Sequence, residues 1–262
     1  MRRGSSFGAV ASVYAEHRPG YPDDAIRWSL APAAASAGVD VAALNVLDLG
    51  AGTGKLTAQL TGIAGSVTAV EPDQGMLAEL CRQLPSVPAF LGSAESIPLP
   101  DASVHAVLCG QSLHWFDLEL ALPEIARVLV PGGVLGALWN SDDDRVGWVA
   151  GLQSAAEGAA SPSLSVRRSG AADVAVAAAA DGVDRYFTPS VTAEFPNGLR
   201  RTAESLAATV STHSKVLVMD PAERARVLAQ VRAYLTSRPE TAAGEFTLPM
   251  VTTVLRTIRK SS

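Results

Sequence analysis

Three glycines alternate with other residues in the stretch GAGTG (50–54), which directly follows a short apolar run. A backbone that lacks side chains at alternate positions lets a bound molecule approach the main chain closely. Asp48 stands two residues before this stretch, and Glu71 follows 21 residues after the first glycine. Two carboxylates near a bare turn predict a site that holds the polar groups of a ligand through hydrogen bonds.

Two common nucleotide-binding patterns do not fit this turn. The phosphate-binding loop G-x-x-x-x-G-K-[ST] needs glycine at 49 and serine or threonine at 56, where the chain has Leu49 and Leu56. The dinucleotide pattern G-x-G-x-x-G needs a third glycine at the position of Lys55. The spacing G-x-G-x-G therefore favours a ligand without a diphosphate, with a nucleoside and an amino-acid tail.

Both carboxylates are predicted at the ends of strands. "NVLDLG" (45–50) and "SVTAVEP" (66–72) are short apolar runs typical of buried parallel strands. Open α/β sheets bind ligands at the carboxyl ends of their strands, where we expect Asp48 to meet an ammonium group and Glu71 a ribose diol. A glycine turn alone, or a single glutamate, is more often purely structural, so the prediction depends on their combination.

The first 140 residues alternate such runs with helical patterns, which predicts an α/β fold. We expect a Rossmann-like, doubly wound sheet, mostly parallel with an antiparallel edge strand, and helices on both faces. "PGG" (131–133) is predicted to be the turn before the fifth strand. Further predicted strands are 88–92, 104–110 and 133–140, and predicted helices are 54–60, 75–84 and 118–129.

The rest of the chain is less regular. Segment 141–185 is rich in small residues and predicts one or two weak helices with a mobile connection, either a surface insertion or a substrate-covering lid. The last strand is expected to pair antiparallel at the sheet edge, where Pro249 is tolerated. Other predicted elements are a strand at 190–196, a helix at 202–214, a helix after the cap Asp220-Pro221-x-Glu223, and a strand at 245–260.

Composition narrows the class of protein. The 262 residues carry a net charge of −5 and 5% aromatic side chains, which argues against a nucleic-acid partner. Cys81 and Cys109 form no metal-ligand pair, so we expect no metal and no disulfide framework. The sequence has neither a secretory signal nor an apolar run near 18 residues, which predicts a cytoplasmic protein without a membrane partner.

Several stretches together carry a resemblance to a known family. The chain resembles the class I S-adenosylmethionine-dependent methyltransferases with a type-11 methyltransferase domain, in the branch related to trans-aconitate and other small-molecule methyltransferases. The resemblance covers nearly the whole chain, least of all 141–185. The stretches are "VYAEHRPGYPDDAI", "VLDLGAGTGKLT", "VTAVEPDQGML", "GSAESIPLPDASVHAVLCGQSLHWF", "ALPEIARVLVPGGVLGALWN" and "FTLPMVTTVLRTIRK".

The resemblance implies a single methyltransferase domain that binds S-adenosylmethionine and releases S-adenosylhomocysteine. Its parts would be an N-terminal cap (1–37), a cofactor-binding core (38–140), a variable acceptor-side insertion (141–215), and a C-terminal helix and edge strand (216–262). The implied cofactor-binding residues are Tyr14, Arg18, Asp48, Gly50, Ala51, Gly52, Gly54, Glu71, Pro72, Asp73, Met76, Ser93, Ala94, Glu95 and Gln111.

Within that set, Asp73 and Met76 would flank the adenosine, and residues 93–95 would line the adenine edge. Ser93 departs from the aspartate that many relatives have there, and a hydroxyl accepts a hydrogen bond with less charge assistance. Tyr14 and Tyr21 would wall the sulfonium, and Arg18 would meet a carboxylate; His17 is a weaker candidate. As an alternative, the stretch 14–22 is an N-terminal arm on the surface.

Methyl transfer requires alignment of the acceptor atom and dry walls, and it needs a general base only when the acceptor carries a proton. The predicted catalytic residues are His114, in "GQSLHWF" (110–116), and Tyr14. His114 is either a base or a donor that orients the acceptor, or else a structural histidine in a loop. Trp139 and Asn140 would border the acceptor site, although Trp139 fits the core equally well. His105 and His213 are expected to be structural.

The leading hypothesis is a methyltransferase that acts on a small molecule, with an oxygen as the acceptor atom, in a monomer or a homodimer. The alternatives are a nicotinamide-dependent oxidoreductase, which Lys55 disfavours, and a non-catalytic protein that kept the cofactor site. The identity of the acceptor does not follow from the sequence.

Overall fold

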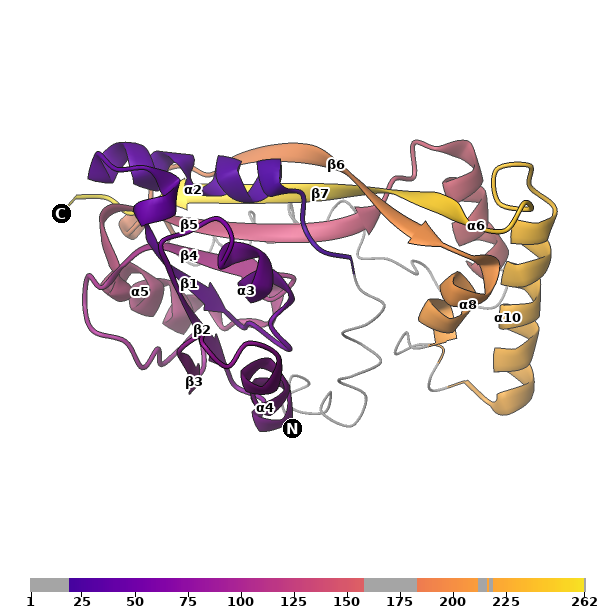
Figure 1. Cartoon of the computed structure of the whole chain (residues 1–262), viewed down its shortest axis with the longest axis horizontal. Helices are drawn as coiled ribbons and strands as arrows, with labels where there is room; N and C mark the ends of the chain where they lie inside the picture. Colours follow the sequence, from indigo (N-terminus) through magenta and orange to yellow (C-terminus); the bar gives the residue numbers. More distant parts are fainter. Residues whose placement is uncertain (1–18, 158–182, 212–215, 217–218, 262) are drawn as a thin grey trace. The chain divides into compact units, whose positions relative to one another are not determined.

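The computed structural model describes residues 19–157, 183–211, 216 and 219–261 (Figure 1). The chain divides into two compact units. The first comprises Met1–Trp139, Arg168–Phe195 and Thr252–Ser262, and the second comprises Asn140–Arg167 and Pro196–Val251. Predictions for Tyr14, His17, Arg18 and His213, and for most of the connection within 141–185, fall outside the described residues.

Seven strands form one sheet in the order β3-β2-β1-β4-β5-β7-β6. The first five strands of the chain pair in parallel, with Asp48 opposite Ala69 of β2 and Leu108 of β4. The strands are β1 (Asn45–Leu49), β2 (Ser66–Glu71), β3 (Ala89–Leu91), β4 (Val104–Gly110), β5 (Leu129–Asp142), β6 (Val191–Arg201) and β7 (Phe246–Ile258). The predicted Rossmann-like, mostly parallel sheet is confirmed.

The last two strands run antiparallel to their neighbours. The N–H of Arg259 donates to the carbonyl of Gly133, and the N–H of Asp143 donates to the carbonyl of Pro249. The end of β7 therefore lies beside the start of β5, and the two strands are antiparallel. The outermost strand is β6, and β7 lies between β5 and β6. The predicted antiparallel edge therefore exists, but the placement of 245–260 and Pro249 at its outer rim is wrong.

A second correction concerns "PGG" (131–133), which was predicted to be a turn before the fifth strand but lies inside that strand. β5 already starts at Leu129, and three residues of β4 (Val104 to Ala106) face six residues of β5 (Leu129 to Val134). The extra residues form an irregularity inside the ladder, as in a β-bulge. A strand that includes such a bulge looks like two elements in the sequence, which is why the turn was predicted there.

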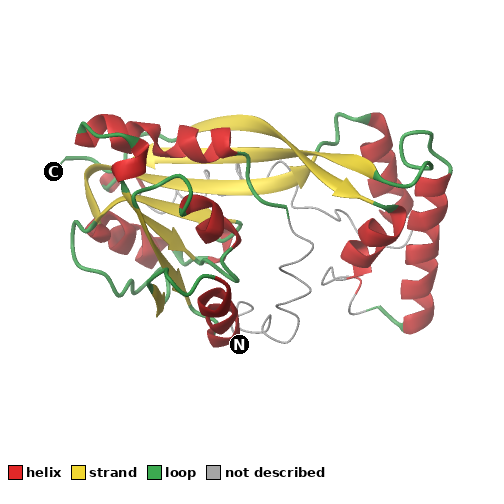
Figure 2. Ribbon diagram, in the orientation of Figure 1, coloured by secondary structure: helices red, strands yellow, loops and turns green. Residues whose placement is uncertain are grey.

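Helices cover both faces of the first unit's part of the sheet (Figure 2). One apolar cluster joins Ile26 and Leu30 of α2 and Leu60 of α3 to one face of the sheet, and another joins Leu122 and Ile125 of α5 to the opposite face. Because neighbouring strand residues point to opposite faces, Asp48 lies on the face that α3 covers. The bounds are α2 (Asp23–Ala37), α3 (Lys55–Leu60), α4 (Gln74–Gln83), α5 (Leu118–Val128), and the 3₁₀ turns η3 (Val41–Ala43), η4 (Leu113–Trp115) and η5 (Val183–Arg185).

The second unit packs three helices around its own apolar cluster. Trp148 and Phe246 meet edge to face with ring centroids 5.7 Å apart, and the Tyr234 hydroxyl donates to the Trp148 carbonyl at 2.8 Å. Asp220 caps the last helix as predicted, because its carboxylate accepts from two backbone N–H groups. The helices are α6 (Gly147–Glu157), α8 (Ala203–Ser211) and α10 (Pro221–Thr236). Within the described residues, no helix has the length and apolar character needed to cross a membrane.

Candidate functional site

The glycine turn joins β1 to α3, and all three of its glycines have positive φ angles. These are 69° at Gly50, 59° at Gly52 and 90° at Gly54. L-residues with side chains rarely adopt this left-handed conformation, so glycine is required here by the backbone alone. The turn is held by the N–H groups of Gly50 and Ala51, which both donate to the Val70 carbonyl.

The three glycines differ in what an added side chain would meet. A Cβ at Gly50 would lie 2.7 Å from the Cβ of Ser112, and one at Gly54 would lie 3.0 Å from the Cγ of Leu80. At Gly52 the nearest atom among the described residues is the sulfur of Met76, at 3.9 Å. Gly50 and Gly54 therefore allow protein to pack closely, whereas no described residue packs as closely against Gly52.

Asp48 is buried at the end of β1, with 1% of its surface exposed. Its Oδ2 accepts a hydrogen bond of 2.6 Å from the Thr57 hydroxyl, which sequence reasoning missed; a hydroxyl early in the helix after the turn was the available signal. Its Oδ1 has no hydrogen-bond partner among the described residues. Burial raises the pKa of Asp48 to about 7, against the opposing effect of the Thr57 hydrogen bond.

Glu71 is also buried, and its two carboxylate oxygens each accept one backbone N–H. Gly52 donates to Oε2 at 2.8 Å, and Asp73 donates to Oε1 at 2.9 Å. Burial raises the pKa of Glu71, and these two hydrogen bonds oppose that shift. A carboxylate has about four acceptor positions, so each oxygen retains capacity for a second donor.

The residues after Glu71 build the start of α4. Asp73 is its N-cap, and its Oδ1 accepts from the N–H groups of Gly75 and Met76. The Met76 side chain is buried, with its sulfur 3.9 Å from a Cβ built at Gly52, while Pro72 is exposed. Their contacts with the cofactor stay a prediction. Asp73 thus has a structural reason for its residue type that is independent of any ligand.

Residues 93–95 follow β3 and are tied to the protein around them. Ser93 pairs with Ser96 in an antiparallel bridge, and Ala94 is buried in the core cluster against α5. Glu95 accepts a hydrogen bond of 3.0 Å from the N–H of Asp117. Their contact with adenine stays a prediction.

β4 ends in a strained turn that reaches the glycine turn. Gln111 is not a glycine, yet it has a φ of 58°, a conformation that often marks functional segments. The next residue, Ser112, donates from its hydroxyl to the Leu49 carbonyl at 2.7 Å. Ser112 was not predicted from the sequence, which gives no signal for this long-range contact.

His114 and Trp115 follow in η4, and both are exposed. Their rings lie 4.8 Å apart between centroids. The indole N–H of Trp139 donates to Nδ1 of His114 at 3.3 Å, while the Trp139 ring is buried in the core. Of the two interpretations of Trp139, the structure supports the core residue. His105 is a satisfied structural histidine as expected, because its Nδ1 accepts from the N–H of Asn45.

Two further predicted residues have clear positions. The Tyr21 side chain is buried with its hydroxyl against Gly110, immediately before Gln111. Asn140 belongs to the second unit, where its Oδ1 accepts from the Asn197 side chain at 3.2 Å.

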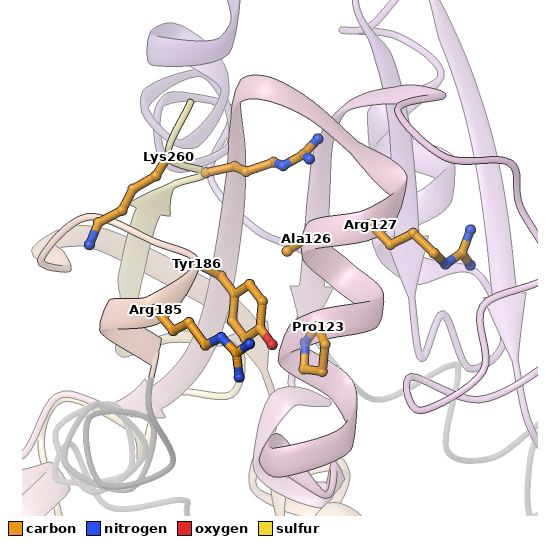
Figure 3. Close-up of a pocket in the computed structure, with 7 residues that line it drawn as sticks. Pro123, Ala126, Arg127, Arg185, Tyr186 and Lys260 are labelled. Atoms are coloured by element: carbon orange, nitrogen blue, oxygen red, sulfur yellow. The ribbon is translucent and has the colours of Figure 1, made fainter. Parts of the chain in front are cut away.

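A separate cavity of about 370 Å³ lies beside α5, η5 and the end of β7 (Figure 3). It is lined by four cationic side chains and Tyr186, and Figure 3 shows Arg127 pointing away from Tyr186. Arg127 forms ion pairs with Glu124 and Asp101. The other three cations are Arg185, which lies over the Tyr186 ring, and Arg259 and Lys260, which donate to backbone carbonyls. This cavity contains none of the predicted site residues.

Comparisons with known proteins identify the class of domain. Residues 47–137 match the type-11 family described as a methyltransferase domain. An uncharacterized methyltransferase of Mycobacterium tuberculosis is 52% identical over 144 residues. That alignment spans 55% of this chain and 56% of the relative, so it covers about half the length of each.

Solved structures show the same fold. A proposed type II methyltransferase of Anaeromyxobacter dehalogenans is 23% identical, with a TM-score of 0.63 over 92% of this chain and 97% of that one. The [4+2]-cyclase SpnF is 19% identical, with a TM-score of 0.53 over 99% and 96%. The strand order and the family match together define residues 47–137 as a methyltransferase domain of the class I, S-adenosylmethionine-dependent fold. Because that fold also occurs in a cyclase, the fold alone does not establish the reaction.

Proposed function

We propose that this protein is an S-adenosylmethionine-dependent methyltransferase that transfers a methyl group to an oxygen of a small molecule, either a carboxylate or a hydroxyl. The observation that carries the proposal is Gly52: among the described residues no atom lies nearer than 3.9 Å to a Cβ built there, and its N–H donates to the Glu71 carboxylate. Within the class, the resemblance to the branch of trans-aconitate and other small-molecule methyltransferases supports a small acceptor, in a monomer or a homodimer.

The residues present fit the cofactor. Asp48 keeps a buried oxygen without a partner among the described residues, and the ammonium group of the cofactor supplies the donor that such an oxygen lacks. Glu71 has acceptor capacity on both oxygens, which suits the two hydroxyls of a ribose. Met76 offers a soft apolar contact for the adenine ring. The bare backbone at Gly52 lets the ligand approach between these groups.

When bound, S-adenosylmethionine would supply a methyl group activated by a positively charged sulfur, which leaves as a neutral thioether once the methyl group is transferred. The protein's own contribution is to hold the cofactor at Asp48 and Glu71 and to orient the acceptor. We propose that the acceptor lies near Gln111 and His114, and that Tyr14 and Arg18 contribute to its binding.

Calorimetric titration tests the proposal against its alternatives. We expect S-adenosylhomocysteine to bind at micromolar concentration and NADH not to bind; the reverse result would identify a nicotinamide-dependent enzyme. Formation of S-adenosylhomocysteine from S-adenosylmethionine is then measured with a panel of carboxylic acids and phenols. Binding without turnover on any of them would indicate a protein that retained the cofactor site for another purpose, such as cyclisation or sensing.

A further inference from the structure

Thr57 joins the two ends of the glycine turn. It is the third residue of α3, it is fully buried, and its hydroxyl donates across 2.6 Å to Oδ2 of Asp48 near the end of β1. The three glycines with positive φ angles lie between these two residues. The hydrogen bond spans nine positions of the chain, and it therefore fixes the carboxylate relative to the helix that begins after the turn.

The same hydrogen bond makes the two oxygens of Asp48 different. Oδ2 accepts from the Thr57 hydroxyl, whereas the buried Oδ1 has no hydrogen-bond partner among the described residues. A donor stabilises a carboxylate more than a neutral carboxyl group, because a hydrogen bond to an ionised oxygen is stronger. Burial favours the neutral form of Asp48, and the Thr57 hydrogen bond opposes that effect.

We infer that Thr57 is a positioning residue that favours the ionised form of Asp48, leaves Oδ1 to the ammonium group of the cofactor, and thereby sets the lower pH limit of cofactor binding. The inference rests on the proposed function. An ammonium group binds a carboxylate more strongly than a neutral carboxyl group, so binding requires Asp48 to lose its proton. Because the pKa of Asp48 is raised to about 7, this proton is lost near neutral pH, where one hydrogen bond changes the ionised fraction.

Two other titratable side chains face Asp48, one from each neighbouring strand. Glu71, at the end of β2, raises the pKa of Asp48 through its negative charge. Cys109, in β4, is buried, and burial together with the charge of Asp48 raises the pKa of its thiol, so the thiol stays neutral between pH 6 and 8.5. Both groups are retained when Thr57 is substituted, so a change in the pH dependence of binding reports on Asp48.

Two ligands separate the contact at Asp48 from the rest of the site. S-adenosylhomocysteine carries an ammonium group, whereas adenosine has the base and the ribose but no amino-acid tail. We expect the affinity of the wild-type chain for S-adenosylhomocysteine to fall as the pH is lowered from 8.5 to 6, because Asp48 takes up a proton. The affinity for adenosine should change less. Calorimetric titration of the full chain across this pH range measures both.

Thr57→Val keeps the branched shape of the side chain and removes the donor. The fall in affinity for S-adenosylhomocysteine should move to higher pH, with a loss on the order of tenfold at pH 7, as expected for one hydrogen bond to a charged group. The affinity for adenosine should stay unchanged, and Thr57→Ser, which retains a hydroxyl, should show the wild-type profile. Thr61→Val is the matched control, because Thr61 lies at the end of the same helix and its hydroxyl donates to the Ala58 carbonyl instead.

Two results would overturn the inference. One is a wild-type affinity for S-adenosylhomocysteine that is the same at pH 6 and pH 8.5, a measurement that does not depend on whether the variants fold. The other is an equal loss of both ligands in Thr57→Val, which would mean that the hydroxyl only maintains the shape of the turn. Failure of the wild type to bind S-adenosylhomocysteine at any pH is a different outcome, and it would refute the proposed function itself and this inference with it.

Discussion

Two glycine-rich segments of this chain, the turn after β1 and the bulge within β5, differ in what surrounds them. In the turn 50–54, a Cβ at Gly52 would meet no atom of the described part of the chain closer than the Met76 sulfur, at 3.9 Å. In "PGG" (131–133), a Cβ at Gly133 would lie 2.8 Å from the carbonyl oxygen of Val130 and 3.0 Å from that of His105. Among the described residues, the first segment leaves space for a ligand, and the bulge in β5 is filled by the protein's own backbone.

The difference shows that glycine has two separate uses in this fold. At Gly133 it lets a bulged strand lie close to β4, which is a packing requirement. At Gly52 it leaves space beside two buried carboxylates, one of which keeps an oxygen without a partner among the described residues. The neighbouring carboxylates, rather than the glycines, distinguish a binding turn from a structural one.

The largest expected effect is the loss of folding stability caused by the buried carboxylate of Asp48. The pKa of Asp48 is raised from 3.8 to about 7, so the folded protein binds this proton more tightly than the unfolded chain does. Stability from this group is therefore full below pH 4, falls as the pH rises, and levels off above about pH 7. Asp48→Asn should remove that loss and stabilise the protein without ligand by up to about 4 kcal/mol at pH 8.

Urea unfolding of wild type and Asp48→Asn at pH 4, 5.5 and 8 measures this effect. Asp24→Asn, at an exposed position in α2, is the control and should show no such growing difference. Asp48→Asn should also weaken binding of S-adenosylhomocysteine, because a neutral amide replaces the carboxylate that we expect to bind the ligand's ammonium group. A stability difference that does not change with pH would mean that Asp48 is not a strained buried carboxylate.

The second prediction separates backbone strain from occupied space at Gly52. Gly52→Val should lower the affinity for S-adenosylhomocysteine on the order of 100-fold or more, about 2.7 kcal/mol, because the side chain enters the space of the ligand. Left-handed backbone also costs a valine roughly 1–2 kcal/mol of stability. Gly38→Val is the matched control, since Gly38 ends α2 with a φ of 67°, and a Cβ there would have no described residue within 4 Å.

Both variants should therefore lose similar stability, and only Gly52→Val should lose binding. The measurements are calorimetric titration and thermal unfolding of both proteins. Equal affinities in the two variants would show that the space over Gly52 is not where the cofactor binds.

Sequence reasoning located this turn but did not distinguish its glycines. The spacing of glycines and carboxylates is local, and the strand ends that bring Asp48 and Glu71 to one edge follow from parallel topology. The close approach of Ser112 to Gly50 joins residues 62 positions apart, which no local pattern encodes. The Trp139–His114 hydrogen bond was missed for the same reason. The position of β7 between β5 and β6 depends on which strands pair, and the sequence of one strand does not specify its partners.

The third prediction concerns the filled turn. Gly133→Ala should destabilise the protein by roughly 1–3 kcal/mol, because the added methyl group presses on two backbone carbonyls. Affinity for S-adenosylhomocysteine, measured below the unfolding temperature, should stay unchanged. Reduced affinity in the folded variant would contradict the claim that Gly133 serves packing alone and that the ligand binds at Gly52.

The smallest expected effect is at Glu71. Glu71→Gln keeps the shape of the side chain but leaves one oxygen as acceptor, so one of the donors, Gly52 or Asp73 or a ribose hydroxyl, loses its partner. Binding of S-adenosylhomocysteine should weaken by roughly 0.5–1.5 kcal/mol. Titration with adenosine, which has the ribose but no amino-acid tail, should show the same loss; an unchanged adenosine affinity would remove Glu71 from the ribose contact.

A crystal structure grown with S-adenosylhomocysteine tests the account most directly. It should place the ribose hydroxyls within hydrogen-bonding distance of the Glu71 carboxylate, the amino group toward Oδ1 of Asp48, and the ligand against the Gly52 backbone. A ligand bound elsewhere, for example in the cationic cavity beside Tyr186, with the turn at Gly52 left empty, would contradict it.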